Sequence, residues 1–241
     1  MRDPGNKKKT VKDIASRMVM LNDPLSPISE AYRTLRTNIL HIAPENQVKT
    51  LLLTSAHPNE GKTVTIANLG IAMAETVGNV LLIDCDMRKP ALHYAFGLEK
   101  ENGLSDVLEK DVPWQEVIKE TGIGNLSIMT SGYIPLNPSK LVSSHKAKEL
   151  LNELKECFDI IVLDTSAVLA VTDASVLASI VDGVILVVLA QKTLRETAMR
   201  SVTLLNNVRA NILGVILNGI PLSTRYGYYY YYHYKYNMPD S

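Results

Sequence analysis

The sequence predicts an α/β domain with a mainly parallel, doubly wound sheet and helices on both faces of that sheet. Two observations lead to this fold class. The predicted strands are short, nearly continuous aliphatic runs such as "VKTLLLTS", "NVLLIDCD" and "DGVILVVLA", and a strand that is apolar along its length is buried on both faces. Segments with helical periodicity separate these runs, which is typical of parallel sheets. The chain of 241 residues is long enough for one such domain with short tails.

The first expected element is a helix over about residues 30–41. Ser29 is its expected N-cap, and residues 31, 35, 39 and 42 form an apolar stripe along it. Residues 1–27 combine a lysine triplet at 7–9 with prolines at 24 and 27 and weak periodicity, so we expect a flexible N-terminal arm. The folded domain is expected to span residues 28–222, followed by a flexible tail over 223–241.

The remaining elements alternate between the two kinds. Each is bounded by a change from helical periodicity to a continuous apolar run, or the reverse. The sequence predicts strands at 48–55, 79–86, 125–132, 159–165, 182–190 and 211–219, and helices at 62–77, 103–110, 114–121, 144–158, 172–181 and 193–208.

Composition restricts the possible classes of function. Lysine plus arginine equals aspartate plus glutamate at 25 each, and we find no local basic face of the kind that nucleic-acid binding requires. Cys85 and Cys157 lie in apolar runs and are expected to be reduced and buried rather than paired. The longest aliphatic run is far shorter than the ~20 residues that cross a bilayer, and the N-terminus lacks a signal-peptide core. We therefore expect a cytoplasmic protein.

The segment "AHPNEGKT" lies between a predicted strand and a predicted helix and has the spacing of a P-loop. Such a loop directs backbone N–H groups at phosphate, with a lysine for the outer phosphates and a hydroxyl for Mg²⁺. Asparagine tolerates the left-handed backbone region at position 59, where a glycine is expected. A helix start without a nucleotide is the alternative. The candidate nucleotide-binding residues are Ala56, His57, Pro58, Asn59, Glu60, Gly61, Lys62, Thr63 and Val64.

Three aspartates follow two of the predicted strands. Asp84 and Asp86 end one strand, and Asp164 ends another. In open parallel sheets, ligands bind beyond the carboxyl ends of the strands, so these carboxylates are expected beside the P-loop. They are candidates for holding Mg²⁺ and for taking a proton from an attacking hydroxyl. A cap of the following turn is the alternative for Asp84 or Asp86 alone.

The C-terminal segment "YGYYYYYHYKY" has neither strand nor helix periodicity, so burial of one face does not explain it. Eight of the chain's 11 tyrosines lie there. The residues are Tyr226, Tyr228, Tyr229, Tyr230, Tyr231, Tyr232, Tyr234 and Tyr236.

Taken together, these motifs resemble the bacterial tyrosine kinases of capsule and exopolysaccharide operons, of the CpsD and CapB type, which are related to the MinD and ParA ATPases. The resemblance rests on "VLLIDCDMR", the helix "SEAYRTLRTNI", the loops "NPSKLVSS" and "VLAVTDA", and the tyrosine cluster. It implies a P-loop nucleoside-triphosphatase fold and an ATP- and Mg²⁺-dependent autokinase. It also implies a membrane protein whose cytoplasmic segment activates the kinase at the inner face of the membrane, and a cognate phosphotyrosine phosphatase.

The same resemblance implies roles for individual residues. Lys62 would contact the phosphates, Thr63 and Asp86 would hold Mg²⁺, and Asp84 would be the base or a second metal ligand, with Asp164 in the outer shell of the metal. Asn218 stands where related ATPases bind adenine. Glu30, Arg33 and Arg36 would join subunits into a ring, although their spacing alone favours solvated pairs on one helix. The family commonly has Asp-Thr-Pro-Pro where this chain has Asp-Thr-Ser-Ala at 164–167.

Two other functions fit parts of the sequence. A switch ATPase of the MinD or ParA kind shares most of these motifs, but it carries a signature lysine where this chain has His57, and it lacks a tyrosine cluster. We expect His57 to be a solvated loop residue. An adhesive scaffold would use the tyrosines but would leave the P-loop and the aspartates without a purpose. The sequence therefore favours a kinase whose tail, about fourteen residues with a reach of roughly 20 Å, enters a neighbouring subunit or its own site.

Overall fold

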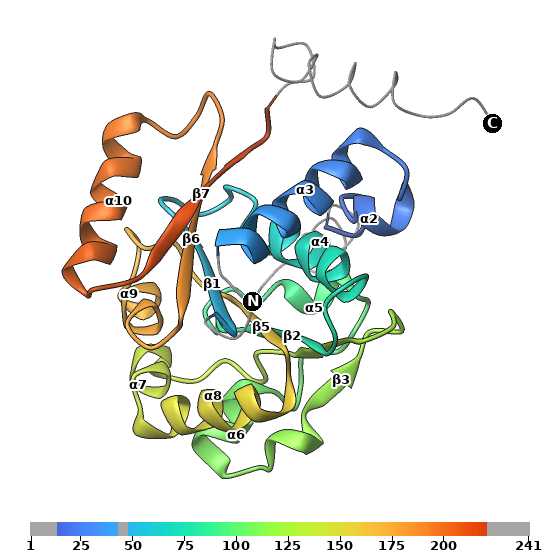
Figure 1. Ribbon diagram of the computed structural model, residues 1–241. Helices are drawn as coiled ribbons and strands as arrows, with labels where there is room; N and C mark the ends of the chain where they lie inside the picture. Colours follow the sequence, from blue (N-terminus) through green and yellow to red (C-terminus); the bar gives the residue numbers. More distant parts are fainter. Residues whose placement is uncertain (1–13, 43–47, 221–241) are drawn as a thin grey trace, which may run out of the picture.

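The computed structural model describes residues 14–42 and 48–220. A seven-stranded sheet forms its centre, in the order β3-β4-β2-β5-β1-β6-β7 (Figure 1). All neighbouring strands are parallel except β3, which is antiparallel to β4. The mainly parallel α/β fold is therefore confirmed. The strands are β1 (Thr50–Ser55), β2 (Val80–Asp84), β3 (Ile118–Glu120), β4 (Leu126–Met129), β5 (Ile160–Asp164), β6 (Gly183–Leu189) and β7 (Ile212–Asn218).

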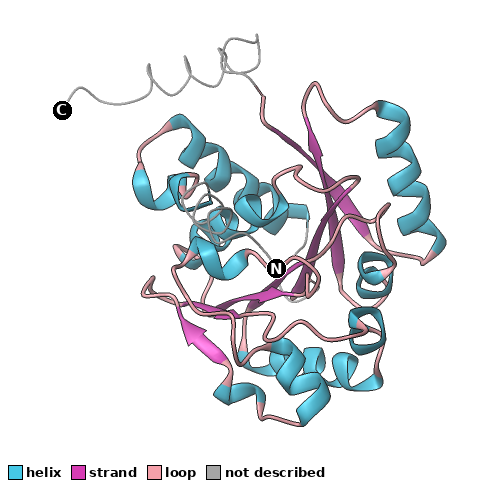
Figure 2. Cartoon of the chain, turned by 180° about the vertical axis from the view of Figure 1, so that it is seen from behind, coloured by secondary structure: helices cyan, strands magenta, loops and turns pink. Residues whose placement is uncertain are grey.

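Helices cover the sheet on both sides, as the two views in Figures 1 and 2 show. One apolar cluster lies between the sheet and the helices α2, α3, α4 and α5, and the other lies beneath α6, α7, α8, α9 and α10. The helices are α2 (Val19–Asn22), α3 (Pro27–Ile42), α4 (Lys62–Ala74), α5 (Leu92–Ala95), α6 (Leu104–Lys110), α7 (Pro138–Val142), α8 (His145–Cys157), α9 (Asp173–Ala178) and α10 (Arg195–Asn207).

Alternation along the central strands supplies both clusters. In β1, Leu51 and Leu53 belong to the cluster beneath α4, whereas Leu52 belongs to the opposite one, and all three are fully buried. Because successive side chains of a strand point to opposite faces, a strand covered on both sides must be apolar throughout. This double burial explains the continuous aliphatic runs in the sequence.

The N-terminal arm predicted over residues 1–27 is wrong for its described part. Met18 and Met20 are buried in the cluster beneath α4. The backbone N–H of Met20 donates to Oδ1 of Asn68 in α4 over 3.0 Å, and the Asn68 amide donates to the carbonyl of Arg17 over 3.0 Å. This segment is anchored by two buried methionines and by its hydrogen bonds with Asn68. Such a short set of apolar residues shows no helical or strand periodicity, so the sequence did not indicate that the segment packs on the domain. Residues 1–13 lie outside the described residues.

Helix α3 begins three residues before its predicted start. Pro27 is its first residue, a position where proline loses no hydrogen bond. The hydroxyl of Ser26 accepts the N–H of Ser29 over 3.2 Å, so Ser26 has the capping role that we predicted for Ser29. Ser29 is instead buried inside the helix, and its hydroxyl donates to the carbonyl of Asp23 over 2.7 Å.

Three further local predictions need correction. The helix predicted at 114–121 is a 3₁₀ turn (Trp114–Glu116) followed by the edge strand β3, whose pairing with β4 overrides its helical composition. The short helices α5 and α7 were not predicted. Cys85 is buried as expected, whereas Cys157 is exposed at the end of α8.

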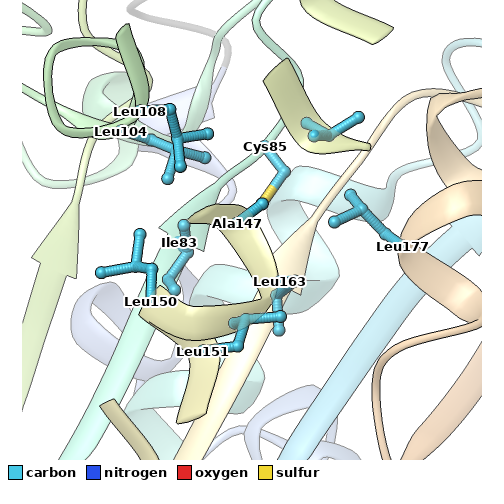
Figure 3. A pocket seen from close by; sticks show the side chains of 10 residues that line it. Ile83, Cys85, Leu104, Leu108, Ala147, Leu150, Leu151, Leu163 and Leu177 are labelled. Atoms are coloured by element: carbon cyan, nitrogen blue, oxygen red, sulfur yellow. The ribbon is translucent and has the colours of Figure 1, made fainter. Parts of the chain in front are cut away.

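A small apolar pocket lies between β2, β5 and the helices α6, α8 and α9 (Figure 3). Its wall includes Ile83, Cys85, Leu104, Ala147 and Leu163, and all of its lining residues are apolar apart from the thiol of Cys85. A phosphate or a nucleotide needs polar partners, so this pocket belongs to the core. In the part of the chain that the structure describes, we find no helix with the length and hydropathy of a membrane span.

Candidate active site

The P-loop leaves β1 after Ser55 and enters α4 at Lys62. Gly61 is the N-cap of α4 with a φ of 92°, and a Cβ atom at this position would lie 2.1 Å from the amide nitrogen of Asn218. Both the backbone and the close neighbour therefore require glycine. Asn59 has a φ of 66°, the left-handed conformation that asparagine was expected to tolerate. The loop thus presents the start of a 13-residue helix, where the helix dipole favours anions.

Lys62 is held inside this loop rather than in solvent. Its side chain is part of a residue only 8% exposed, and its ammonium donates to the Ser55 hydroxyl over 3.0 Å. Ser55 in turn donates to the carbonyl of His57 over 2.7 Å. His57, Pro58 and Asn59 are exposed, in agreement with the prediction that His57 is a solvated loop residue. The ammonium is therefore positioned at the end of β1, beneath an exposed loop tip.

Glu60 and Asn218 attach the P-loop to the far side of the sheet. The buried carboxylate of Glu60 accepts the N–H of His57 over 3.0 Å and the hydroxyl of Thr193, which follows β6. The Asn218 amide, at the end of β7, donates to the carbonyl of Glu60 over 3.0 Å. Thr193 belongs to no motif found in the sequence. Asn218 lies against the P-loop, as a nucleotide contact at that position requires.

Asp84 and Asp164 are direct neighbours at the carboxyl ends of β2 and β5. Oδ2 of Asp164 accepts the Thr63 hydroxyl over 2.7 Å, which links the strand to the first turn of α4. The oxygens of Asp84 accept the N–H groups of Asp86, Ala91 and Leu92 over 3.1–3.2 Å. Both oxygens of Asp84 therefore hold the backbone of the loop that follows β2.

Asp86 lies in that loop and is only partly buried. Its Oδ1 accepts the N–H groups of Arg88 and Lys89 over 3.2 and 3.0 Å. Within residues 14–42 and 48–220, no three acidic, histidine or cysteine side chains come together as a metal-binding group. The three predicted aspartates thus share one edge of the sheet without forming a common ligand cluster.

Burial and mutual repulsion make these carboxylates reluctant to ionise. Burial raises the pKa of Asp164 to about 6, although the charge of Lys62 and the bond from Thr63 oppose the shift. Burial also raises the pKa of Asp84 well above its usual value, and the charge of Asp164 adds to the effect. A cation placed beside this pair would relieve both effects.

Another buried aspartate, Asp173, organises the opposite side of the site. Asp173, the first residue of α9, accepts the Arg88 Nε over 2.9 Å and also the Ser139 hydroxyl. Arg88 further donates to Ser139 over 2.8 Å. The network connects the loop after β2 with α7 and α9. Sequence reasoning found Arg88 within a motif but missed its two partners.

The structure places the predicted oligomerisation residues in an ion cluster between α3 and α4. Arg33 contacts both oxygens of Glu75 over 2.9 and 3.0 Å, and Arg36 contacts the same carboxylate over 2.9 Å. Glu30 lies 3.4 Å from Arg33. The two arginines therefore hold the C-terminal end of α4 within one chain.

The predicted tail leaves the described chain close to this site. Strand β7 ends at Asn218, whose side chain contacts the P-loop, so the last described residues lie at the same edge as Lys62. The eight tail tyrosines, at 226 to 236, lie outside the described residues.

Comparison with known proteins agrees with this geometry. Residues 49–213 match the family described as AAA domain. The chain is 41% identical over 224 residues to the tyrosine-protein kinase YwqD of Bacillus subtilis, covering 90% of this chain and 94% of the relative. It is 38% identical over 218 residues to the putative tyrosine-protein kinase CapB of Staphylococcus aureus, covering 90% and 96%.

Solved structures lead to the same family. The chimerical protein CapA2B2 superposes with a TM-score of 0.81 at 36% identity, covering 86% of this chain and 91% of that chain. The kinase domain of Escherichia coli tyrosine kinase ETK gives 0.83 at 31% identity, covering 86% and 81%. The septum site-determining protein MinD from Pyrococcus horikoshii, complexed with Mg-ADP, gives 0.61 at 26% identity, covering 70% and 69%.

Proposed function

The chain belongs to the bacterial tyrosine-protein kinases, on a P-loop ATPase fold, and from this premise we propose that it phosphorylates the tyrosine cluster at its own C-terminus. The γ-phosphorus of ATP forms a bond to a tyrosine Oη, and its bond to the oxygen bridging the β- and γ-phosphates breaks, releasing ADP. From the resemblance we further propose that this reaction regulates capsular or exopolysaccharide synthesis and export.

One observation carries the proposal. The end of β7 contacts the P-loop through Asn218 and Glu60, and the tyrosines begin eight residues after Asn218, at Tyr226. The described chain therefore ends at the same edge of the sheet as the donor site, a few residues before the tyrosine cluster begins in the sequence. Since phosphoryl transfer depends mainly on positioning and on charge stabilisation, a lysine held in place and a nearby acceptor segment are the parts that it requires.

The residues at the end of β5 and the start of α4 suit a hydrated Mg²⁺ ion with ATP. Thr63 and Asp164 supply oxygen atoms, and Oδ1 of Asp164 is buried without a hydrogen-bond partner in the described chain. Mg²⁺ prefers one or two carboxylates plus waters and phosphate oxygens, so three clustered aspartates are not required. Thr63 and Asp164 would hold the ion. When bound, it neutralises charge on the phosphates.

The proton of the attacking tyrosine needs an acceptor, because a phenol with a pKa near 10 is a poor nucleophile at neutral pH. Asp84 was expected to be the base or a second metal ligand, but it is fully buried and already accepts hydrogen bonds from three backbone N–H groups. Asp86 is partly exposed and has one oxygen outside the loop's hydrogen bonds. We therefore propose that Asp86 accepts the proton of the attacking tyrosine. Asp84 holds the loop after β2 in shape through its backbone hydrogen bonds.

Incubation with ATP and Mg²⁺, followed by mass spectrometry, tests the proposal directly. We expect phosphotyrosine within residues 226–236, both alone and more strongly with the cytoplasmic segment of a candidate membrane activator. Replacing one tail tyrosine by phenylalanine should change total phosphate little, whereas replacing all eight should abolish it. Mixing a Lys62→Met chain with an active chain that lacks residues 226–241 reports transfer between subunits.

ATP hydrolysis with an unmodified tail, even with the activator segment present, would instead favour a switch ATPase. The structural similarity to MinD, which was solved with Mg-ADP, is the observation that favours this second function. Because the tail is the only proposed acceptor, its modification separates the two functions without reference to the hydrolysis rate.

We also propose that Glu30, Arg33 and Arg36 join subunits into a ring. Arg33→Ala with Arg36→Ala should reduce the mass measured by light scattering to that of one chain. Glu75→Gln removes the charge that both arginines contact within the chain, while leaving the arginines in place. Ion pairs at the surface contribute roughly 0–1 kcal/mol, so both variants should stay folded. If the double arginine variant and Glu75→Gln show the same mass by light scattering, the three residues only connect α3 to α4 within one chain, and the proposal of a ring contact is wrong.

The remaining partners follow from the same family. We propose that a membrane protein supplies an activating cytoplasmic segment and recruits the chain to the inner face of the membrane, and that a phosphotyrosine phosphatase reverses the modification. The superposition on the chimera CapA2B2 supports a modulator of this kind. The activator arm of the mass-spectrometry experiment tests it, since an unchanged phosphate yield would contradict activation.

A further inference from the structure

Two buried hydroxyls at the end of β5 have no hydrogen-bond partner in the part of the chain that the structure describes. They belong to Thr165 and Ser166, which directly follow Asp164. A buried hydroxyl without a hydrogen-bond partner destabilises the fold. Native structures leave few such groups without a reason, and the segment that carries these two packs against the end of β1, where the Lys62 ammonium is held.

Two contacts fix this segment against the start of the P-loop. The hydroxyl of Thr54 donates to the carbonyl of Ser166 over 3.0 Å, and the N–H of Val168 donates to the carbonyl of Ser55 over 2.9 Å. Ser55 is also the residue that receives the Lys62 ammonium. Residues 166–168 therefore run along the last two residues of β1, beside the strand end where the ammonium rests.

The hydroxyl oxygens of Thr165 and Ser166 are both buried, but the two residues differ in exposure. Thr165 is fully enclosed, whereas the Ser166 residue retains 8% exposure. The backbone carbonyl of Ser166 already accepts the Thr54 hydroxyl, whereas its side-chain hydroxyl has no partner in the described chain. Ser166 thus combines a fixed backbone with an unpaired donor near the surface of the domain.

We propose that the Ser166 hydroxyl donates a hydrogen bond to the terminal phosphoryl group of ATP. The N-terminal amides of α4 serve the inner phosphates, and the lysine of a P-loop reaches the outer ones. The Ser166 segment packs beside Ser55, which accepts the Lys62 ammonium. A hydroxyl donor at this place is therefore expected to meet the outer end of the triphosphate. This inference rests on the proposed use of ATP and adds to it a residue that distinguishes triphosphate from diphosphate.

Binding of two nucleotides to Ser166→Ala tests the inference without relying on catalysis. The probes are Mg-ADP and the non-hydrolysable triphosphate Mg-AMP-PNP, measured by isothermal titration calorimetry. A hydrogen bond to a charged group contributes roughly 1.5–3 kcal/mol, so the affinity for Mg-AMP-PNP should fall about tenfold or more. The affinity for Mg-ADP, which lacks the terminal group, should stay unchanged and shows that the variant is folded.

Two matched variants complete the experiment. Ser105→Ala removes another buried hydroxyl without a partner in the described chain, in α6 two strands away, and should alter neither affinity. Thr165→Val removes the enclosed hydroxyl and should likewise leave the ratio of the two affinities unchanged. If Ser166→Ala binds both nucleotides as the parent does, or weakens both equally, the inference is wrong. If the parent chain binds neither nucleotide, the proposed kinase function fails as well.

Discussion

Replacing Lys62 by methionine should lower the rate of tyrosine phosphorylation on the order of 10³-fold and leave the fold intact. The Lys62 ammonium is the one P-loop cation that the structure holds at the end of β1, through Ser55. Removing a single preorganised group that stabilises charge in a transition state costs about 10²–10³-fold in other enzymes, and here the group also binds the ground state. Initial rates of phosphotyrosine formation, measured with saturating ATP and Mg²⁺, give the comparison.

Two controls make this result specific to the position of the charge. Lys62→Arg keeps the charge but replaces a compact ammonium by a planar guanidinium, which does not fit a residue buried to this degree, and it should lose most of the activity. Lys146→Met removes a lysine of α8 that pairs with an exposed aspartate and should retain full activity. A Lys62→Met chain that phosphorylates its own tail at the parent rate would show that the P-loop is not the catalytic centre.

The sequence predicted the catalytic edge better than its surroundings, for a physical reason. Asp84, Asp164 and Lys62 each stand at a strand end or a helix start, where the chain's local pattern fixes the position of the residue. Glu60, Thr193 and Asp173 act through partners more than 80 residues away in sequence, and no local pattern reports such pairs. The packing of the N-terminal segment was not predicted for the same reason, since Met20 donates to Asn68 across 48 residues.

Spacing alone also gave an incomplete description of the carboxylates. It predicted that the three aspartates share an edge of the sheet, and Asp84 and Asp164 do pair across β2 and β5. The spacing did not predict that the Asp84 carboxylate would accept hydrogen bonds from three backbone N–H groups. Whether a carboxylate faces a ligand or a turn depends on the path of the following loop, which composition leaves undetermined.

Replacing Asp164 by asparagine should abolish most of the phosphotransfer and yet stabilise the chain without ligands. Burial raises the pKa of Asp164 from 3.8 to about 6, so the folded state binds the proton more tightly than the unfolded state. Stability therefore falls as pH rises from about 4 to about 6, by on the order of 3 kcal/mol. Asparagine carries no charge and still accepts the Thr63 hydroxyl. At pH 7.5, with a chelator present, Tm should rise by roughly 6–12 °C.

The pH dependence separates this electrostatic account from a simple packing effect. At pH 4.5 the parent carboxyl is largely protonated in the folded state, so the gain from Asp164→Asn should largely disappear. Asp182→Asn provides a control of opposite sign: although burial opposes it, Lys155 and Thr50 hold the pKa of Asp182 below its usual value, so its charge stabilises the fold at neutral pH. That variant should melt below the parent at pH 7.5. An Asp164→Asn chain that melts at or below the parent temperature at pH 7.5 would contradict a costly buried charge. Stabilisation together with lost activity would instead mean that Asp164 is kept ionised for the cation and phosphates it serves.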